Sequence, residues 1–536
     1  MIRRPRLSTT GAFAPLRATA FRAMWIAALA SQVGTWMETV GAQWILLAHP
    51  HAAVTTALIQ TATTLPVLFL ALPGGALADV FDRRRLLIGI QSVQAGTAGT
   101  IAALAFFDLL NPIELLVLTF ALGCGAALTV APYQALIPEL VPRQELPSAS
   151  ALGSLSVNLA RAVGPAIAGL LVARLGPGYV FALNAASFAA FAVVMASLPR
   201  KAPAAETRPE AFLAAVRAGE RYVRFSPEMR RILLRIALFI TPAVALWALL
   251  PVLAAHRLGL GPTGYGLLLA AVGAGSIGGA FLLPWVRSVL TPNRSYAVCA
   301  AVYAAVLAAL ALTRSPALAA AALVPAGAAW IVVLSNSNAA VQLFLPGWVR
   351  ARGLSAYQFV FSGSQALAAA AWGVAADRLG VPGPLLFAVV LLVLALISGR
   401  WWPYMDTVPL DRSTKVHWPE PHLLIEPEEA EGPVVVLLRY RVAEDRQAGF
   451  VRAMHRVREA RLRTGALQWG VFRSGEDPGA MVEIYTVASW EEHRRQHDER
   501  LTAADYDDEL AAQSYAEGEP EVTHLLSATP NVSGSP

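Results

Sequence analysis

The stretch PGGALADVFDRRRLL, residues 73–87, joins one long apolar run to the next through a short cluster of charges. The apolar runs before and after it, near 54–78 and 86–107, are each long enough to cross a hydrocarbon layer of about 30 Å. Three consecutive arginines between two such runs are typical of a cytoplasmic loop, because basic residues are retained on that side of a membrane. The stretch therefore predicts two membrane helices joined on the cytoplasmic side.

The composition extends this prediction to most of the chain. Hydrophobic residues make up 56% of the 536 residues and charged residues only 15%, which lies outside the range of soluble globular proteins. Apolar runs of about 20 residues recur, and only helices can carry such runs across a bilayer. We predict twelve spans, near 23–48, 54–78, 86–107, 112–137, 149–173, 177–198, 233–255, 263–286, 295–313, 316–345, 354–377 and 381–402.

Basic segments alternate with nearly uncharged connections along these spans. The N-terminal tail, the loop at 82–85 and the loop at 200–231 are rich in arginine, whereas AHPHAAV and DLLNPIE contain no Lys or Arg. The bias predicts a multi-pass membrane protein with both termini in the cytoplasm. The net charge of +6 follows from this asymmetry, so we expect membrane lipid and no nucleic acid as a partner.

The spans fall into two sets of six. Gln134 and Pro138 precede one cytoplasmic turn as Gln342 and Pro346 precede another, a pattern typical of duplicated halves that bind substrate between them near the midplane. The predicted parts are a cytoplasmic tail (1–22), the first six-helix half (23–198), a cytoplasmic linker (199–232), the second half (233–402), a linker (403–432), a soluble domain (433–526) and a disordered tail (527–536).

Gly75, Asp79, Arg83 and Arg84 have the spacing of the loop signature of the major facilitator superfamily. Val80 and Asp82 depart from the usual basic residue and glycine of that signature. With IPELVPRQEL at 137–146 and NLARAVGPAIAGLL at 158–171, the chain resembles the branch of bacterial exporters that includes the enterobactin exporter and the transmembrane secretion effectors. The resemblance implies the major facilitator fold and transport of a small molecule.

A cytoplasmic latch is the expected role of this loop. Asp79 ends the second span, where the N-terminus of the eleventh span near Ser355 would present its positive dipole. Arg83 and Arg84 can pair with Asp79 or with Glu139, and such a cluster must break when the inner gate opens. The alternative is that the arginines only snorkel and fix the topology.

Arg161 lies in the middle of an apolar span, where a charge is costly and almost always faces a partner or a cavity. Glu38 in the first span is the deep acidic candidate, and the resemblance places both spans at the central cavity. We expect a Glu38–Arg161 pair that couples transport to a proton, since a change in pairing would change the pKa of Glu38. A static ion pair and direct binding of an anionic substrate by Arg161 remain alternatives.

Other residues of the spans are candidates for the same site. Asn158 lies one turn before Arg161 and shares its face, and Gly164, Pro165 and Gly169 resemble the glycine-proline motif that bends the fifth span of antiporters. The remaining candidates for lining the cavity are Trp36, Gln43, Asn336, Asn338 and Gln342.

The segment 433–526 has soluble composition and the order βαββαβ, which is ferredoxin-like. Val436, Leu438, Tyr440 and Val442 alternate as a strand, and Phe450, Met454 and Val457 share one helix face. The segment resembles dimeric domains of the antibiotic-biosynthesis-monooxygenase type. An enzyme would use His455, His493 and His497, but His493 and His497 also suit an exposed helix face, and we expect a dimerisation or regulatory module without metal or cofactor.

These observations favour a proton-driven exporter of small amphipathic compounds, such as siderophores, macrolides or other secondary metabolites, and not an enzyme. A membrane-anchored enzyme or regulator that acts through its tail, and an uptake transporter, are the alternatives. The sequence has no G-x-x-x-x-G-K-[S/T] loop, which argues against a pump driven by ATP.

Overall fold

The computed structural model describes residues 13–198, 219–404 and 423–528. The predicted structure of residues 1–12, of the linker at 199–218, of 405–422 and of the tail at 529–536 lies outside these ranges. The described residues form two compact units. The first comprises 13–198, Leu234–Asn336 and Gln358–Tyr404, and the second comprises 219–233, Ser337–Tyr357 and 423–528.

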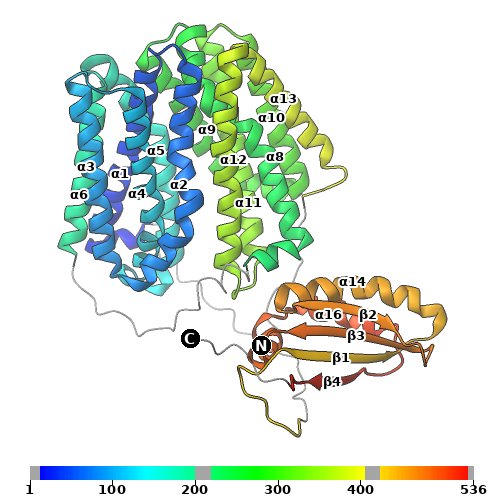
Figure 1. Cartoon of the computed structure of the whole chain (residues 1–536). Helices are drawn as coiled ribbons and strands as arrows, with labels where there is room; N and C mark the ends of the chain where they lie inside the picture. The colour runs from blue at the N-terminus through cyan, green and yellow to red at the C-terminus, as the bar shows by residue number, and fades with distance from the viewer. Residues whose placement is uncertain (1–12, 199–218, 405–422, 529–536) are drawn as a thin grey trace, which may run out of the picture. The chain divides into compact units, whose positions relative to one another are not determined.

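Long helices make up the membrane part (Figure 1). Those before residue 199 are α1 (Thr19–Leu46), α2 (Ala52–Val80), α3 (Arg83–Phe106), α4 (Pro112–Leu140), α5 (Leu146–Leu175) and α6 (Pro177–Ser197). Those after residue 226 are α8 (Pro227–Val252), α9 (Pro262–Val289), α10 (Pro292–Leu312), α11 (Pro316–Phe344), α12 (Arg350–Leu379) and α13 (Pro382–Ser398). Proline opens many of these helices, as expected at a first helical position whose N–H has no intrahelical acceptor.

Ten of the described helices are long and apolar enough to cross a bilayer. The 28-residue α1 is not among those ten, and α13 is a shorter apolar helix of 17 residues. Even so, α1 packs against α5 and α6, and α13 packs against α10. The protein is thus a multi-pass, mostly helical membrane protein, and the number twelve stays a prediction.

The two sets of helices meet along α5 and α9, where small residues allow close approach. A Cβ on Gly266 would lie 2.4 Å from the Pro165 carbonyl oxygen, and one on Gly273 would lie 2.4 Å from the Ala162 Cα. At the same end of the bundle, α2 contacts α12: the Thr61 hydroxyl donates to the Ala366 carbonyl at 2.8 Å. We call these two contacts the α5–α9 seam and the α2–α12 seam.

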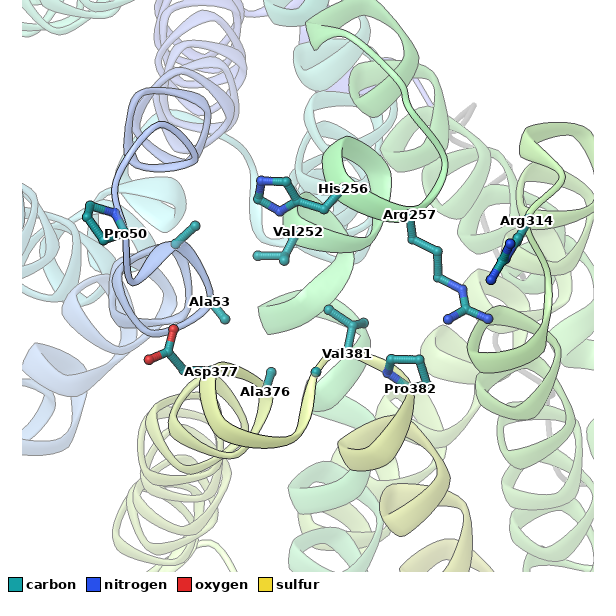
Figure 2. A pocket seen from close by; sticks show the side chains of 12 residues that line it. Pro50, Ala53, Val252, His256, Arg257, Arg314, Ala376, Asp377, Val381 and Pro382 are labelled. Atoms are coloured by element: carbon teal, nitrogen blue, oxygen red, sulfur yellow. The ribbon is translucent and has the colours of Figure 1, made fainter.

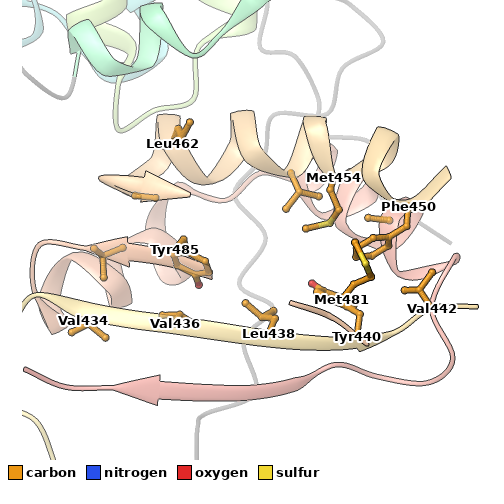
Figure 3. Packing of buried hydrophobic residues seen from close by; sticks show 14 of the residues in the cluster. Val434, Val436, Leu438, Tyr440, Val442, Phe450, Met454, Leu462, Met481 and Tyr485 are labelled. Atoms are coloured by element: carbon orange, nitrogen blue, oxygen red, sulfur yellow. The ribbon is translucent and has the colours of Figure 1, made fainter. Parts of the chain in front are cut away.

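The second unit contains a four-stranded antiparallel sheet of order β2-β3-β1-β4, built from β1 (Val434–Arg441), β2 (Gln468–Arg473), β3 (Ala480–Val487) and β4 (Glu521–Leu525). The helices α14 (Gln447–Thr464), α15 (Trp490–Arg495) and α16 (Ala503–Gln513) complete the order βαββαβ, so the predicted ferredoxin-like topology is confirmed. Figure 3 shows the core, in which Val436, Leu438 and Tyr440 of β1 face Phe450 and Met454 of α14.

Candidate functional site

Arg161 lies near the middle of the 30-residue α5. The carbon Cζ of its guanidinium lies 5.4 Å from the ring centre of Trp36 in α1 and 6.0 Å from that of Trp247 in α8. Its Nε and Nη1 are buried, and no described residue accepts a hydrogen bond from them. The side chain as a whole keeps partial exposure. Among the described residues, two indoles and no carboxylate therefore lie next to this charge.

The sequence next to Arg161 explains how the indole of Trp36 comes so close. A Cβ on Gly164 would lie 2.8 Å from the Trp36 Cβ, so only glycine lets α5 approach α1 at this level. Pro165 lies inside α5 and has no N–H, which leaves the carbonyl of Arg161 without its usual intrahelical donor. Gly169 permits a similar approach to α9, where a Cβ would lie 2.6 Å from the Pro262 carbonyl oxygen.

The expected ion pair between Glu38 and Arg161 does not form. The buried Glu38 carboxylate instead accepts a hydrogen bond from the Asn184 side chain of α6. Successive residues of a helix are about 100° apart, so Glu38 projects about 200° away from Trp36, the α1 residue that faces Arg161. Glu38 and Arg161 thus lie in two separate polar sites, on either side of α1.

Asn184 was missed because only a charged residue, Arg161, was considered as the partner of Glu38. A single asparagine within FALNAASFAAF is the signal that could have found it, since a polar residue in an apolar span faces a partner. Gly34 makes room for it: a Cβ there would lie 2.4 Å from the Asn184 Oδ1. The Ser187 hydroxyl also approaches that oxygen, at 3.3 Å.

The other candidates for lining the cavity are distributed over several places. The half-buried Asn158 donates to the Ser154 carbonyl of its own helix at 2.9 Å. Gln43 accepts from the Tyr265 hydroxyl of α9 at 2.5 Å and so bridges the two halves. Asn336 accepts from Arg287 Nε at 2.9 Å and donates to Ser295 at 3.2 Å. The exposed side chains of Asn338 and Gln342 bond to each other.

One of the ion pairs expected of the loop at 82–85 is present within the first half. Arg83 Nη1 lies 2.5 Å from Glu139 Oε1, so this pair joins α3 to α4. Arg84 instead donates to the carbonyls of Met195 and Ala196 at the end of α6, where a cation complements the helix dipole. Asp82 caps α3 by accepting from the Arg85 N–H at 2.7 Å. The side chain of Asp79 lies outside the described residues, and a Cβ on Gly75 would meet nothing within 4 Å.

At the end of the bundle that carries the α1–α2 turn, His51 Nδ1 lies 2.7 Å from Asp377 Oδ2 and joins α2 to α12. A pocket of about 550 Å³ adjoins this pair, with His256, Arg257, Arg314 and Asp377 in its wall (Figure 2). No role was predicted for these residues from the sequence. In the sequence, these residues stand out as isolated ionisable side chains in connections that otherwise carry almost no charge.

Three histidines gather in the C-terminal domain. His493 Nε2 lies 3.2 Å from His524 Nε2, and the ring centres of His493 and His497 are 4.9 Å apart. Burial, together with His524 and Arg461, lowers the pKa of His493 to about 3. His455 is exposed and lies outside the group, and in the described ranges no cluster of His, Cys, Asp or Glu could hold a metal ion.

The expectation of an exposed face for His493 and His497 is therefore wrong. The side of α15 that carries His493 packs against Tyr485 of β3, and His497, in the π-helical turn Gln496–Arg500, lies on the same side, with its ring centre 4.9 Å from that of His493. His493 is fully buried between Tyr485 and Trp490. His524 was missed because it lies in β4, far along the sequence from the other two.

The transmembrane secretion effector family, part of the major facilitator superfamily, matches residues 10–531. The chain belongs to this family. The match extends over the C-terminal domain as well as the helices.

Curated relatives of this transmembrane secretion effector match over part of their length. The staphyloferrin A transporter of Staphylococcus aureus is 30% identical over 31% of this chain and 42% of its own. The multidrug efflux pump Tap of Mycolicibacterium fortuitum is 29% identical over 38% of this chain and 52% of its own. The enterobactin exporter EntS of Shigella boydii is 30% identical over 49% and 62%. The chain thus spans about half the length of the curated relatives it matches.

Solved structures agree on the fold of this transmembrane secretion effector. A nucleoside transporter, NupG, covers 72% of this chain with a TM-score of 0.62 at 10% identity, and all of its own chain is matched. A bacterial homologue of the human lysosomal transporter Spinster, in an inward-facing form, covers 72% of this chain and 98% of its own, with a TM-score of 0.55 at 15% identity. At these identities the likeness concerns the fold alone.

Proposed function

We propose that this chain is a secondary active exporter of small amphipathic organic compounds. The observation that carries the proposal is the guanidinium of Arg161, which lies between an indole of the first half and an indole of the second. A cation flanked by aromatic rings offers both charge and apolar surface to a ligand. Family membership and the relatives named as a multidrug efflux pump and an enterobactin exporter support this direction of transport.

The arrangement of the halves suggests how such a site is exposed alternately. Trp36 and Trp247 belong to different halves, so a rocking motion would separate the two indoles and change the surroundings of Arg161. The α5–α9 and α2–α12 seams close the bundle at the end that carries the α1–α2 turn. We assign that end of the bundle to the outside of the cell and both termini to the cytoplasm. We also assign the protein to the inner membrane, with twelve helices that cross it.

We assign proton coupling to Glu38. Among the described residues of the membrane helices, it is the acid whose side chain is buried. Its carboxylate has one amide partner, Asn184, so a change in the contact between α1 and α6 would change the balance between its charged and neutral forms. This role differs from the original hypothesis, because Arg161 is not its counter-charge. Asp79, Arg83, Arg84 and Glu139 keep their proposed role at the inner gate.

The C-terminal domain is proposed as a regulatory or dimerisation module. Within the second unit, Glu492 accepts from Arg500 at 2.6 Å and from Arg221 at 3.3 Å. The guanidinium carbon of Arg500 also lies 5.0 Å from the ring centre of Trp348. The domain thus shares charged contacts with the segments that precede α8 and α12, which is the place where a regulator would act.

The test is a whole-cell accumulation screen of dyes, macrolides and siderophores, with and without a protonophore. Cells that produce the protein should accumulate less of at least one compound, and the protonophore should abolish the difference. Glu38→Gln should lower export of that compound while the amount of protein in the membrane stays near wild type. Export that ignores the protonophore would refute proton coupling, and higher accumulation in producing cells would indicate uptake.

A further inference from the structure

We propose that Arg161 binds a carboxylate or similar oxyanion of the transported molecule, and that Trp36 and Trp247 contact the apolar group beside it. The inference rests on the proposed export function and defines its substrates as amphipathic organic anions. Three observations carry it. Arg161 Nε and Nη1 have no acceptor among the described residues, a second arginine of the same bundle does have acceptors, and two indoles flank the Arg161 guanidinium.

The missing partner is the first observation. Buried charges in proteins are paired or hydrogen-bonded, because loss of hydration is otherwise uncompensated. Within the described residues no carboxylate lies against Arg161, and its buried Nε and Nη1 donate to nothing. An arginine stays charged near neutral pH and carries five N–H donors. A ligand with hydrogen-bond acceptors can therefore pair with the donors of Arg161 that the described residues leave unpaired.

Arg235 in α8 provides the contrast. Its Nη1 donates to the Ala395 carbonyl at 2.7 Å and lies 3.1 Å from the Ser398 hydroxyl. Its Nη2 lies 3.3 Å from Asn293 Oδ1, and the Tyr296 ring lies 4.3 Å from Cζ. This is the arrangement of an arginine that joins α8 to α10 and α13. Within the part of the chain that the structure describes, Arg161 joins no helices by hydrogen bonds, so a role in holding helices together does not explain an arginine at this position.

The indoles indicate the shape of the ligand. Trp36 and Trp247 have ring centres 6.0 Å apart, and Trp247 lies 5.6 Å from Trp330 in α11. Aromatic surface therefore continues from the guanidinium into the second half. A planar oxyanion can bind the guanidinium fork in bidentate fashion, while an attached ring or acyl group would lie against Trp36 and Trp247, the two indoles next to that fork.

Binding to the purified full-length protein tests the site separately from transport. The probes are 2-naphthoate and its neutral amide, 2-naphthamide, titrated by equilibrium dialysis. Wild type should bind the naphthoate at least about 10-fold more tightly than the amide, the effect of one charge-assisted pair. Arg161→Gln should remove this preference and leave binding of the amide, whereas Arg161→Lys should restore part of it because lysine keeps the charge without the planar fork.

Arg235→Lys is the matched control, since it alters a buried arginine of the same bundle that has protein acceptors. It should leave the preference for naphthoate unchanged. Equal binding of the two probes by wild type, or a preference that survives Arg161→Gln, would overturn the anion site; it would mean that the two indoles alone stabilise the cation. Anion binding without export of any compound in cells would overturn the proposed function and leave the site standing.

Discussion

Replacement of Gly273 by alanine should weaken the α5–α9 seam. The new Cβ would lie 2.4 Å from Ala162 Cα and 2.7 Å from Ala162 Cβ, whereas carbon atoms in contact prefer about 3.5–4.0 Å. The two helices must therefore separate by roughly 1 Å, and such overpacking costs about 1–3 kcal/mol. If only the conformation with a closed seam bears this cost, the alternative conformation gains about 5- to 150-fold in relative population.

Gly278→Ala is the matched control in the same helix, because a Cβ at Gly278 would meet nothing within 4 Å. Both substitutions remove a helical glycine and so gain similar helix propensity, about 1 kcal/mol. The difference between them isolates the contact with Ala162.

The assay is chemical cross-linking across the α2–α12 seam. His51→Cys and Asp377→Cys, in a protein with Cys124 and Cys299 replaced by alanine, should be joined by a short bifunctional thiol reagent, since the native side chains lie 2.7 Å apart. The cross-linked fraction should fall with Gly273→Ala and stay near the parent level with Gly278→Ala. Equal cross-linking of the two variants would show that the seam does not control the conformation of that end.

Asp79→Asn should impair transport with little change in membrane insertion, as measured by export rate per amount of protein, because a neutral amide loses most of its attraction to a helix dipole and to arginine. Glu38→Gln and Arg161→Gln should have additive effects on the pH profile of transport, since distant sites without shared partners add. Truncation after Trp402 should leave measurable transport in vesicles. Acidification from pH 7 to pH 4 should destabilise the C-terminal domain: the pKa of His493 is about 3 when folded and 6.5 ordinarily, so the unfolded state binds more protons below pH 6.5. Stability then falls by up to about 1.4 kcal/mol per pH unit for this histidine, and hydrogen exchange of residues 434–525 should follow it.

Periodicity predicted the soluble domain well because its strands alternate in a simple way. Val436, Leu438, Tyr440 and Val442 are all buried, as an alternating strand on one face of a core requires. The π-helical turn after α15 was not predictable by the same means, since helical spacing assumes 3.6 residues per turn. An exposed face was considered for His493 and His497 because Arg494 and Arg495 lie beside them, and the sequence does not show that His493 packs against Tyr485 of β3.

The sequence predicted where membrane helices lie along the chain, but not which side of each helix faces which neighbour. Hydropathy marks where a span begins and ends, whereas nearly every side of a span is apolar, so the sequence does not tell which side faces which neighbour. Glu38 and Arg161 were joined because both are charged and deep. The rotation of α1 turns Trp36, and not Glu38, toward Arg161, and it turns Glu38 toward Asn184.

Arg161 and Arg235 both lie within membrane helices, but their positions differ. Arg161 lies in the middle of its span, where insertion scales assign the highest cost, whereas Arg235 lies near the start of the span at 233–255, four residues after Arg231. Arg235 recovers that cost from acceptors on α10 and α13, and those acceptors are a carbonyl, a hydroxyl and an amide, which no search for acids would find. Arg161 recovers part of it from two indoles and none from hydrogen bonds to described residues. Arg161 is a charge at the centre of the membrane part without hydrogen-bond acceptors among the described residues. An acceptor that arrives with the ligand explains such a charge best. The partners of a buried charge therefore indicate its function better than its depth does.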